Sequence, residues 1–372
     1  MLKKFKVANF KCFKDEFVFD LSTVKNYSFN TECIKNDIVN NAIIYGFNGS
    51  GKSNLGWAIF DIVEHMTDNN RQEFPYKHYT NAYNGSEIAS FEYEFLLGGT
   101  SRVTYRYSKS DYKKILSESL YINDKEVISF DRNNGNTTFI SHLKGTEQLN
   151  KNIDNQSLSV LKYIKNNSVL EENPENKTFK DFFHFVEHIL FFRSLEDRMY
   201  IGQSSGSVTL TDEIIREDKV EEFESFLHEA NIECKLSVVK DGMGNKNIAF
   251  NFGEKKILLT DIMSTGTSSL MLFYYWYLYI QREVSFVFID EFDAFYHHEL
   301  SRLVIKKLRQ SGIQFIVTTH NTSIMTNDLM RPDCLYLMNN RKILPLAQCT
   351  EKELREAHNI EKIYKAGGFY DE

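Results

Sequence analysis

Apolar residues recur along the chain in two periods, and these periods predict the order of its strands and helices. Between residues 3 and 20, short apolar pieces around Phe5 and Phe17 indicate a strand or hairpin. The wholly apolar run 42–45 predicts a buried strand. Apolar residues then recur at helical spacing over 55–66, which predicts an amphipathic helix.

The next segment alternates with the period of a strand. Residues 87–97 and 102–107 flank the turn Gly98-Gly99 and predict a hairpin, and residues 121–130 predict another. Residues 131–155 are rich in Asn, Gly and Thr, which is typical of a loop.

Helical spacing returns over 158–192 and 220–227, where Phe182, Ile189 and Leu190 are expected on one helix face. A third hairpin is predicted over 236–252.

The last third predicts alternating strands and helices. Buried strands are expected at 284–289 and 313–318, a buried helix at 270–280 and an amphipathic helix at 300–308. Thr350 and Glu353 have the spacing of a capping box, which predicts a short terminal helix.

Composition narrows the class of protein. The chain has 372 residues, 42% hydrophobic and 26% charged, which excludes a collagen-like, coiled-coil or wholly disordered protein. Its net charge of -7 weighs against a surface that coats nucleic acid or membrane.

Cysteine use and hydropathy bear on the compartment. Five scattered cysteines without a CxxC pair predict neither a zinc site nor a disulfide framework, and favour a reducing cytoplasm. The N-terminus lacks the apolar core of a signal peptide, and the longest apolar run is shorter than the roughly 20 residues that span a bilayer.

A phosphate-binding loop is the clearest motif. It matches G-x-x-x-x-G-K-S, after a buried strand and before an amphipathic helix. Its glycines let backbone N–H groups face phosphates, the lysine would reach the β- and γ-phosphates, and the serine hydroxyl would bind Mg²⁺. The residues expected to bind ATP here are Gly46, Phe47, Asn48, Gly49, Ser50, Gly51, Lys52, Ser53 and Asn54.

An acidic pair ends the apolar run 284–289. Asp290 is expected to hold Mg²⁺ together with Ser53, and Glu291 to deprotonate the attacking water. Two solvated acids at a strand end would be the plainer explanation if the phosphate loop were absent.

A histidine follows the next buried strand, and we expect it at the same edge of a parallel sheet. His320 lies 29 residues after Glu291, one strand–helix–strand step later. It is a candidate sensor of the γ-phosphate, although a lone histidine is more often structural.

A serine–glycine segment directly precedes the buried helix at 270–280. Ser264 would cap this helix and Gly266 would allow close backbone approach. Capping alone would explain the segment, but its place 26 residues before Asp290 favours a nucleotide-binding role for Ser264, Thr265 and Gly266.

Taken together and in this order, the four motifs resemble those of ABC-type ATPases. The 237 residues between Ser53 and Asp290, the opening LKKFKVANFKCF and Asp293 are similar to the RecF/SMC/OLD branch. The closest resemblance is to compact bacterial ATP-binding proteins of abortive-infection and anti-phage systems, which the C-terminal IEKIYKAGGFYDE also resembles. The resemblance implies an α/β fold: an ATPase head with a mixed sheet, an antiparallel β-subdomain and a helical insertion.

The resemblance also implies a mechanism. Two subunits would pack head to tail, each ATP lying between Gly46–Ser53 of one and Ser264–Gly266 of the other. The catalytic residues would be Lys52, Glu291 and His320, with ATP and Mg²⁺ as cofactors. The signature reads STGT rather than SGGQ, Ser268 follows it, and the glutamine loop is unassigned, with Gln72 and Gln148 as candidates.

The same resemblance implies three parts: an N-terminal lobe over 1–150, a helical insertion over 151–230 and a C-terminal lobe over 231–372. No long heptad region exists, and the 52 residues after His320 are too few for a fused nuclease. We therefore expect an ATPase that oligomerises and senses for, or regulates, a separate nuclease or toxin.

Two alternative functions remain open at this stage. One is a RecF-like DNA-binding ATPase and the other is a non-hydrolysing scaffold that uses ATP to dimerise. A basic N-terminus supports the first, although a solvated strand edge explains it more simply. Its residues are Lys3, Lys4, Lys6, Lys11 and Lys14.

A metal site is an alternative for one segment. His184, Glu187 and His188 have metal-ligand spacing, but the surrounding apolar periodicity favours a packed amphipathic helix with the histidines on its flank.

Overall fold

The structure is a computed structural model. It describes residues 1–68, 77–133, 135–193, 200–202 (backbone only), 210–240, 242, 244–339 and 341–369.

An antiparallel sheet is built from strands within the first 141 residues, with the strand order β10-β9-β8-β7-β6-β1-β2. Its alternating burial confirms the first two hairpins and the opening hairpin predicted from period-two patterning. Its strands are β1 Leu2–Ala8, β2 Phe17–Asp20, β6 Ala89–Leu97, β7 Ser101–Lys109, β8 Ile115–Ile122, β9 Lys125–Asp131 and β10 Ile140–Ser141.

The central sheet has the order β12-β11-β16-β17-β5-β18-β19, and brings both ends of the sequence together. Pairings from β11 to β18 are parallel, and the two edge strands are antiparallel, so the predicted mixed α/β fold is confirmed. Its strands are β5 Asn41–Tyr45, β11 Ile189–Arg193, β12 Tyr200–Gly202, β16 Phe286–Asp290, β17 Gln314–Thr319, β18 Leu335–Met338 and β19 Ile343–Pro345.

Helix α1 (Lys52–Met66) lies between the two sheets, and its burial on nearly every side follows from that position. Towards the central sheet, Gly56 lies so close that an added Cβ would be 2.6 Å from Phe191 and 2.9 Å from Phe288. Towards the antiparallel sheet, the Tyr93 hydroxyl donates to the Ala58 carbonyl at 2.9 Å.

Helix α7 (Thr265–Ile280) covers the opposite face of the central sheet. Successive residues of a strand point to opposite faces, so neighbouring side chains of β11 contact different helices. Phe191 contacts α1 through Trp57, while its neighbour Phe192 stacks on Trp276 of α7. This confirms the predicted buried helix at 270–280. None of the described helices is long and apolar enough to pass through a bilayer.

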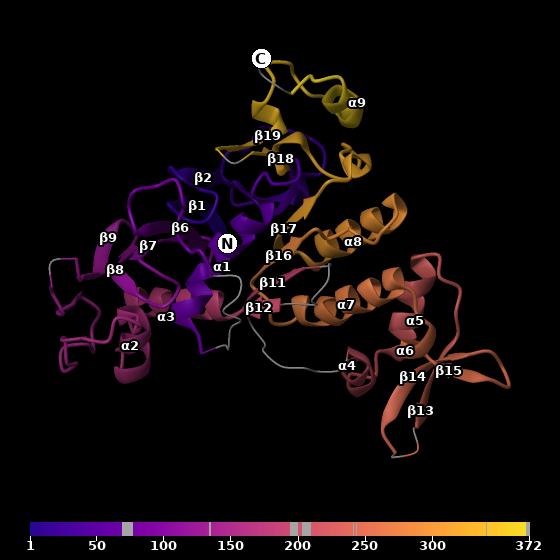
Figure 1. The fold of residues 1–372 in the computed structure, drawn as a ribbon, viewed down its shortest axis with the longest axis horizontal. Helices are drawn as coiled ribbons and strands as arrows, with labels where there is room; N and C mark the ends of the chain where they lie inside the picture. The colour runs from indigo at the N-terminus through magenta and orange to yellow at the C-terminus, as the bar shows by residue number, and fades with distance from the viewer. Residues whose placement is uncertain are drawn as a thin grey trace.

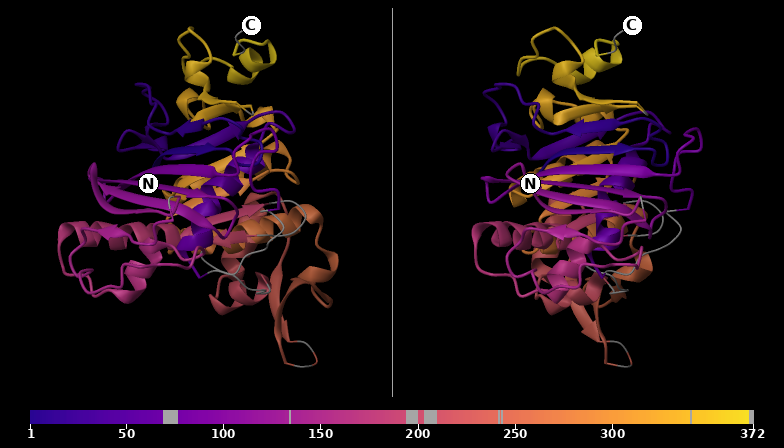
Figure 2. Two further views of the ribbon diagram at one scale, coloured as in Figure 1. Left: turned by 60° about the vertical axis from the view of Figure 1, so that its left-hand side comes forward. Right: turned by 90° about the vertical axis from the view of Figure 1, so that its left-hand side faces the viewer.

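The remaining helices surround this core. A small sheet of β13 Leu236–Lys240, β14 Lys246–Asn251 and β15 Lys256–Leu258 projects from the end away from the C-terminus and contains the predicted third hairpin (Figures 1 and 2). The helices are α2 Val160–Asn167, α3 Pro174–Glu187, α4 Leu210–Arg216, α5 Val220–Glu229, α6 Leu259–Ile262, α8 His298–Ser311 and α9 Ile360–Lys365.

Two local predictions were wrong. The helical pattern expected to reach residue 192 ends with α3, and Ile189 and Leu190 lie in β11, which pairs in parallel with β16. A four-residue apolar run fits a helix face and a buried strand equally well, and here sheet pairing decides. The predicted division at 150 and 230 stays a prediction.

The capping box at Thr350 was also wrong. Glu353 pairs with Arg355 at 2.9 Å instead of closing a helix turn. The terminal helix α9 begins at Ile360, where the Asn359 side chain accepts from the Lys362 N–H.

A buried ion pair joins α1 to the antiparallel sheet. Lys109 of β7 donates to Asp61 of α1 at 2.7 Å, and both side chains are 0% exposed. Tyr107 donates to Asp61 at 2.9 Å and Tyr79 at 3.0 Å, so the carboxylate has several donors. A buried charge with this many partners fixes the relative position of helix and sheet.

We expect Lys109→Met to lower the free energy of unfolding by about 3–5 kcal/mol, because it leaves a buried carboxylate without its cation. Denaturant melting checks this. Lys177→Ala, which breaks the exposed pair with Asp181, is the control and should cost under about 0.5 kcal/mol. An equal effect of the two substitutions would contradict the structural role.

Candidate functional site

The phosphate loop spans residues 46–51, between the end of β5 and the start of α1. Gly49 and Gly51 have φ of 76° and 96°, a left-handed conformation that favours glycine. At Gly46, a Cβ would lie 2.5 Å from the Ser50 Oγ and 2.6 Å from the Met338 carbonyl oxygen. The backbone therefore favours glycine at Gly46 and Gly51, the two positions that the motif specifies, and also at Gly49, where the motif allows any residue.

The loop presents its outer residues to solvent and its lysine inward. Phe47, Asn48 and Gly49 are exposed, while Ser50 and Lys52 are buried. Gly51 precedes α1 without a side-chain cap, so the first N–H groups of the helix face this loop. Ser53 and Asn54 follow in the first turn, both half-buried.

Lys52 holds the loop and the histidine together. Its ammonium donates to the Gly46 carbonyl at 2.8 Å and the Phe47 carbonyl at 3.3 Å, and lies 3.0 Å from His320 Nε2. Burial lowers the pKa of Lys52, against the opposing effect of Asp290 and Glu291. The lysine, the histidine and the acid pair therefore lie close together at one edge of the central sheet, as the sequence predicts.

His320 lies directly after β17. An ammonium can only donate, so His320 Nε2 accepts from Lys52 and the ring is neutral. Burial and the Lys52 charge both lower the pKa of His320.

Thr318 orients the acid pair. Its hydroxyl donates to Asp290 Oδ1 at 2.6 Å and accepts from the Glu291 N–H at 2.8 Å. Glu291 has φ of 49°, a left-handed conformation uncommon for a non-glycine residue and concentrated at functional sites.

Asp290 suits a magnesium ligand. It is 0% exposed, and Oδ2 accepts no hydrogen bond among the described residues. A buried carboxylate oxygen without a donor is a strong ligand for a hard cation such as Mg²⁺. The residues of this edge therefore fit the ion that the sequence predicts.

Arg193 belongs to the site and was missed by sequence reasoning. It ends β11 in register with Asp290; its Nε lies 3.3 Å from Asp290 Oδ2 and its Nη2 3.7 Å from Glu291 Oε2. The sequence did contain a signal for it. The apolar run ILFF is followed by the charged Arg193, just as the apolar run FVFI is followed by the acid pair.

Neither glutamine candidate is placed at this edge. Gln148 is exposed in the loop after β10, at the far side of the antiparallel sheet, and Gln72 lies outside the described residues. The residue at the end of the strand next to Asp290 is Arg193.

The serine–glycine segment forms the N-terminus of α7. Ser264 caps the helix as predicted, its Oγ accepting from the Thr267 N–H at 3.1 Å. Ser264 and Thr265 are exposed, and a Cβ at Gly266 would lie 3.4 Å from the Phe295 carbonyl oxygen. Glycine therefore lets the loop after the acid pair approach the start of α7.

Asp293 fixes that loop. It accepts from the Thr319 hydroxyl at 2.7 Å, and burial raises its pKa.

The basic N-terminus is largely neutralised. Lys4 pairs with Asp20 at 2.8 Å, Lys6 with Glu92 at 2.9 Å and Lys3 with Glu94 at 3.7 Å. These pairs favour a solvated sheet face over a phosphate-binding patch.

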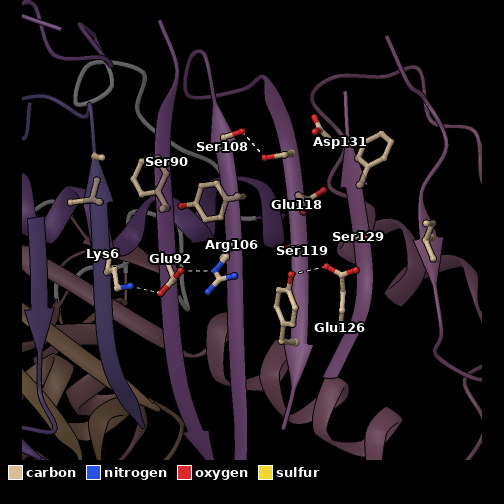
Figure 3. A pocket seen from close by; sticks show the side chains of 18 of the residues that line it. Lys6, Ser90, Glu92, Arg106, Ser108, Glu118, Ser119, Glu126, Ser129 and Asp131 are labelled. Atoms are coloured by element: carbon tan, nitrogen blue, oxygen red, sulfur yellow. Dashed lines mark hydrogen bonds and ion pairs between the residues drawn. The ribbon is translucent and has the colours of Figure 1, made fainter. Parts of the chain in front are cut away.

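A polar cavity of about 540 Å³ lies along the outer face of the antiparallel sheet and is lined mainly by residues of its strands (Figure 3). Glu92 lies between Lys6 and Arg106 on adjacent strands and pairs with both. The other charged residues that face solvent there are Glu16, Glu126 and Asp131, so the cavity does not attract a polyanion.

The histidine pair of α3 fits the packed-helix interpretation. Phe182 and Val186 face the core, His184 is exposed, and His188 Nδ1 lies 2.7 Å from the His184 carbonyl oxygen. Glu187 pairs with Lys165. The residues that the structure describes contain no group of three His, Cys, Asp or Glu suited to a metal.

Comparison with solved structures finds SMC heads. The chain is similar to an SMC head bound to the C-winged helix domain of ScpA (12% identity, 92% of this chain and 96% of that chain, TM-score 0.49). It is also similar to an SMC head domain from Thermotoga maritima (16% identity, 92% of this chain and 98% of that chain, TM-score 0.45). A third similar structure is an Smc head domain with an extended coiled coil, bound to the C-terminal domain of ScpA derived from Pyrococcus furiosus (11% identity, 93% of this chain and 97% of that chain, TM-score 0.45).

No curated protein matches the sequence. A family model does match, over residues 42–326, and its description reads "AAA domain, putative AbiEii toxin, Type IV TA system". The match runs from the strand before the phosphate loop to beyond His320, and covers more than half of the chain. The chain belongs to this AAA family.

Proposed function

We propose that this protein binds and hydrolyses Mg²⁺-ATP at the carboxyl edge of its central sheet. The observation that carries the proposal is the convergence of Lys52, at the start of α1, with Asp290 and Glu291 at the end of β16 and His320 after β17. Membership of an AAA family supports nucleotide binding.

Each residue has a distinct task in this proposal. Backbone N–H groups of residues 46–51 and the Lys52 ammonium bind the phosphates. Ser53 and Asp290 would hold Mg²⁺, which supplies positive charge beside the transferred phosphoryl group. Glu291 accepts a proton from the attacking water, and the neutral His320 hydrogen-bonds the γ-phosphate.

We also propose a head-to-tail dimer. Ser264, Thr265 and Gly266 lie at the N-terminus of α7, where the helix dipole favours an anion, and the first two are exposed to a second subunit. Asn48 and Phe47 of the facing loop are equally exposed.

A separate effector completes the proposal. The family description names a toxin of a type IV toxin–antitoxin system, which supports a role in regulating a nuclease or toxin in anti-phage defence. The lysines of β1 form ion pairs with acidic residues, and the polar cavity on the antiparallel sheet has mainly acidic residues facing solvent. Neither feature supports the RecF-like DNA-binding alternative.

The first prediction concerns Lys52. Lys52→Ala should weaken ATP binding by at least about tenfold, because it removes a buried charge beside the phosphates. Equilibrium titration with a fluorescent ATP analogue checks this. Lys177→Ala, at an exposed position of α3, is the charge-matched control. Unchanged affinity in Lys52→Ala would refute the phosphate-loop assignment.

The second prediction separates an ATPase from a scaffold. Glu291→Gln should keep ATP affinity within a few-fold and lower turnover by about 10²-fold or more, because the amide cannot accept the proton. Single-turnover phosphate release measures it. If wild type and variant both release phosphate at the same negligible rate, the non-hydrolysing scaffold is correct.

The third prediction concerns pH. His320 should titrate below its ordinary pKa of 6.5 in the folded protein, so it contributes stability above that pH that is lost as pH falls through the folded pKa. Histidine NMR should show this. Lys52→Ala should bring the pKa of His320 only part of the way back to its ordinary value, because burial lowers this pKa more than the Lys52 charge does. An unchanged pKa of His320 in Lys52→Ala would contradict the contact between the two side chains.

A further inference from the structure

We propose that Arg193 competes with the magnesium ion for Asp290, and thereby couples metal binding to release of Glu291. Arg193 is a positioning residue in this proposal, which rests on the proposed function and specifies how the same site is regulated.

The backbone of the central sheet places Arg193 at the acids. β11 and β16 are parallel neighbours, and their register pairs Arg193 with Asp290. Its guanidinium spans both acids, 3.3 Å from Asp290 Oδ2 and 3.7 Å from Glu291 Oε2.

The two oxygens of Asp290 have different partners. Oδ1 accepts from Thr318 at 2.6 Å, which leaves Oδ2 as the oxygen for a metal ion. Arg193 Nε faces that oxygen. Asp290 would supply Oδ2 to a divalent cation, whose positive charge would repel the guanidinium that faces the same oxygen. Arg193 must therefore move away when the ion binds.

Electrostatics explains why the arginine is there. Asp290 is 0% exposed, and a buried carboxylate without a counter-charge is costly. Among the residues with described side chains, Lys52 is also close to the acids, but it already contacts Gly46, Phe47 and His320. Arg193 supplies the compensating charge.

Arg193 is also able to leave. Its side chain is 28% exposed, so the guanidinium can move towards solvent while Asp290 stays buried. Because one guanidinium faces both acids, its departure from Asp290 also removes it from Glu291. The proposed base then becomes available to a water molecule only after the metal is bound.

The test is a Mg²⁺ titration of the full chain with a fluorescent, non-hydrolysable ATP analogue. Arg193→Gln should lower the Mg²⁺ concentration at half-saturation by roughly fivefold, because the competitor is gone. Arg193→Lys should lie between wild type and Arg193→Gln, and provides the test if the glutamine variant does not fold. Arg282→Gln, which removes an exposed partner of Glu217, is the matched control and should not change the titration.

Thermal unfolding gives a readout apart from turnover. Without Mg²⁺, Arg193→Gln should melt below wild type, because Asp290 lacks its counter-charge. Saturating Mg²⁺ with the analogue should narrow that difference, because the ion takes the place of the guanidinium.

Two results would overturn the proposal. One is a Mg²⁺ half-saturation in Arg193→Gln that is equal to or higher than that of wild type, which indicates a purely structural or phosphate-binding arginine. The other is a melting difference that Mg²⁺ and the analogue leave unchanged. Failure of the proposed function is distinguishable, because wild type and Lys52→Ala would then show the same absence of Mg²⁺-dependent nucleotide binding.

Discussion

The confinement of α1 between two sheets is the constraint on which the rest of the site depends. The N-terminus of this helix ends the phosphate loop, and its buried body contacts Phe191 and Phe288 on one side and Tyr93 on the other. A helix packed on both faces cannot rotate or slide without opening a close-packed core. The direction in which the first N–H groups point is therefore set by contacts one to two turns further along the helix.

The ion pair of Asp61 with Lys109 adds specificity to that packing. Apolar contacts are non-directional, whereas the buried Asp61 carboxylate has directional bonds to a lysine and two tyrosine hydroxyls, which all have to be met at once. The antiparallel sheet thus helps to support the proposed nucleotide site, although the proposed nucleotide-binding residues all lie outside it.

Sequence reasoning recovered the motifs whose chemistry is local. The phosphate loop, the apolar strand before Asp290 and the strand before His320 each contain their own signal, and parallel pairing then brings them to one edge. The local signal at Arg193 is weak, a single charge after the run ILFF, because its partner Asp290 is distant in sequence and the run continues the apolar phase of α3. The pair Asp61 and Lys109 was hidden for the same reason: each lies within an amphipathic pattern, and only the fold shows that they meet.

The strand order also has a consequence for how the chain acquires its site during synthesis. β5, which leads into the phosphate loop, has β17 and β18 as its neighbours, and both come from the last sixth of the sequence. The antiparallel sheet can form from local hairpins while the ribosome is still at work, but β5 has no partner until nearly the whole chain has emerged. A nascent or truncated chain would therefore carry the complete phosphate-loop sequence without the sheet edge that the proposed nucleotide site requires, so the proposed activity would begin only in finished molecules.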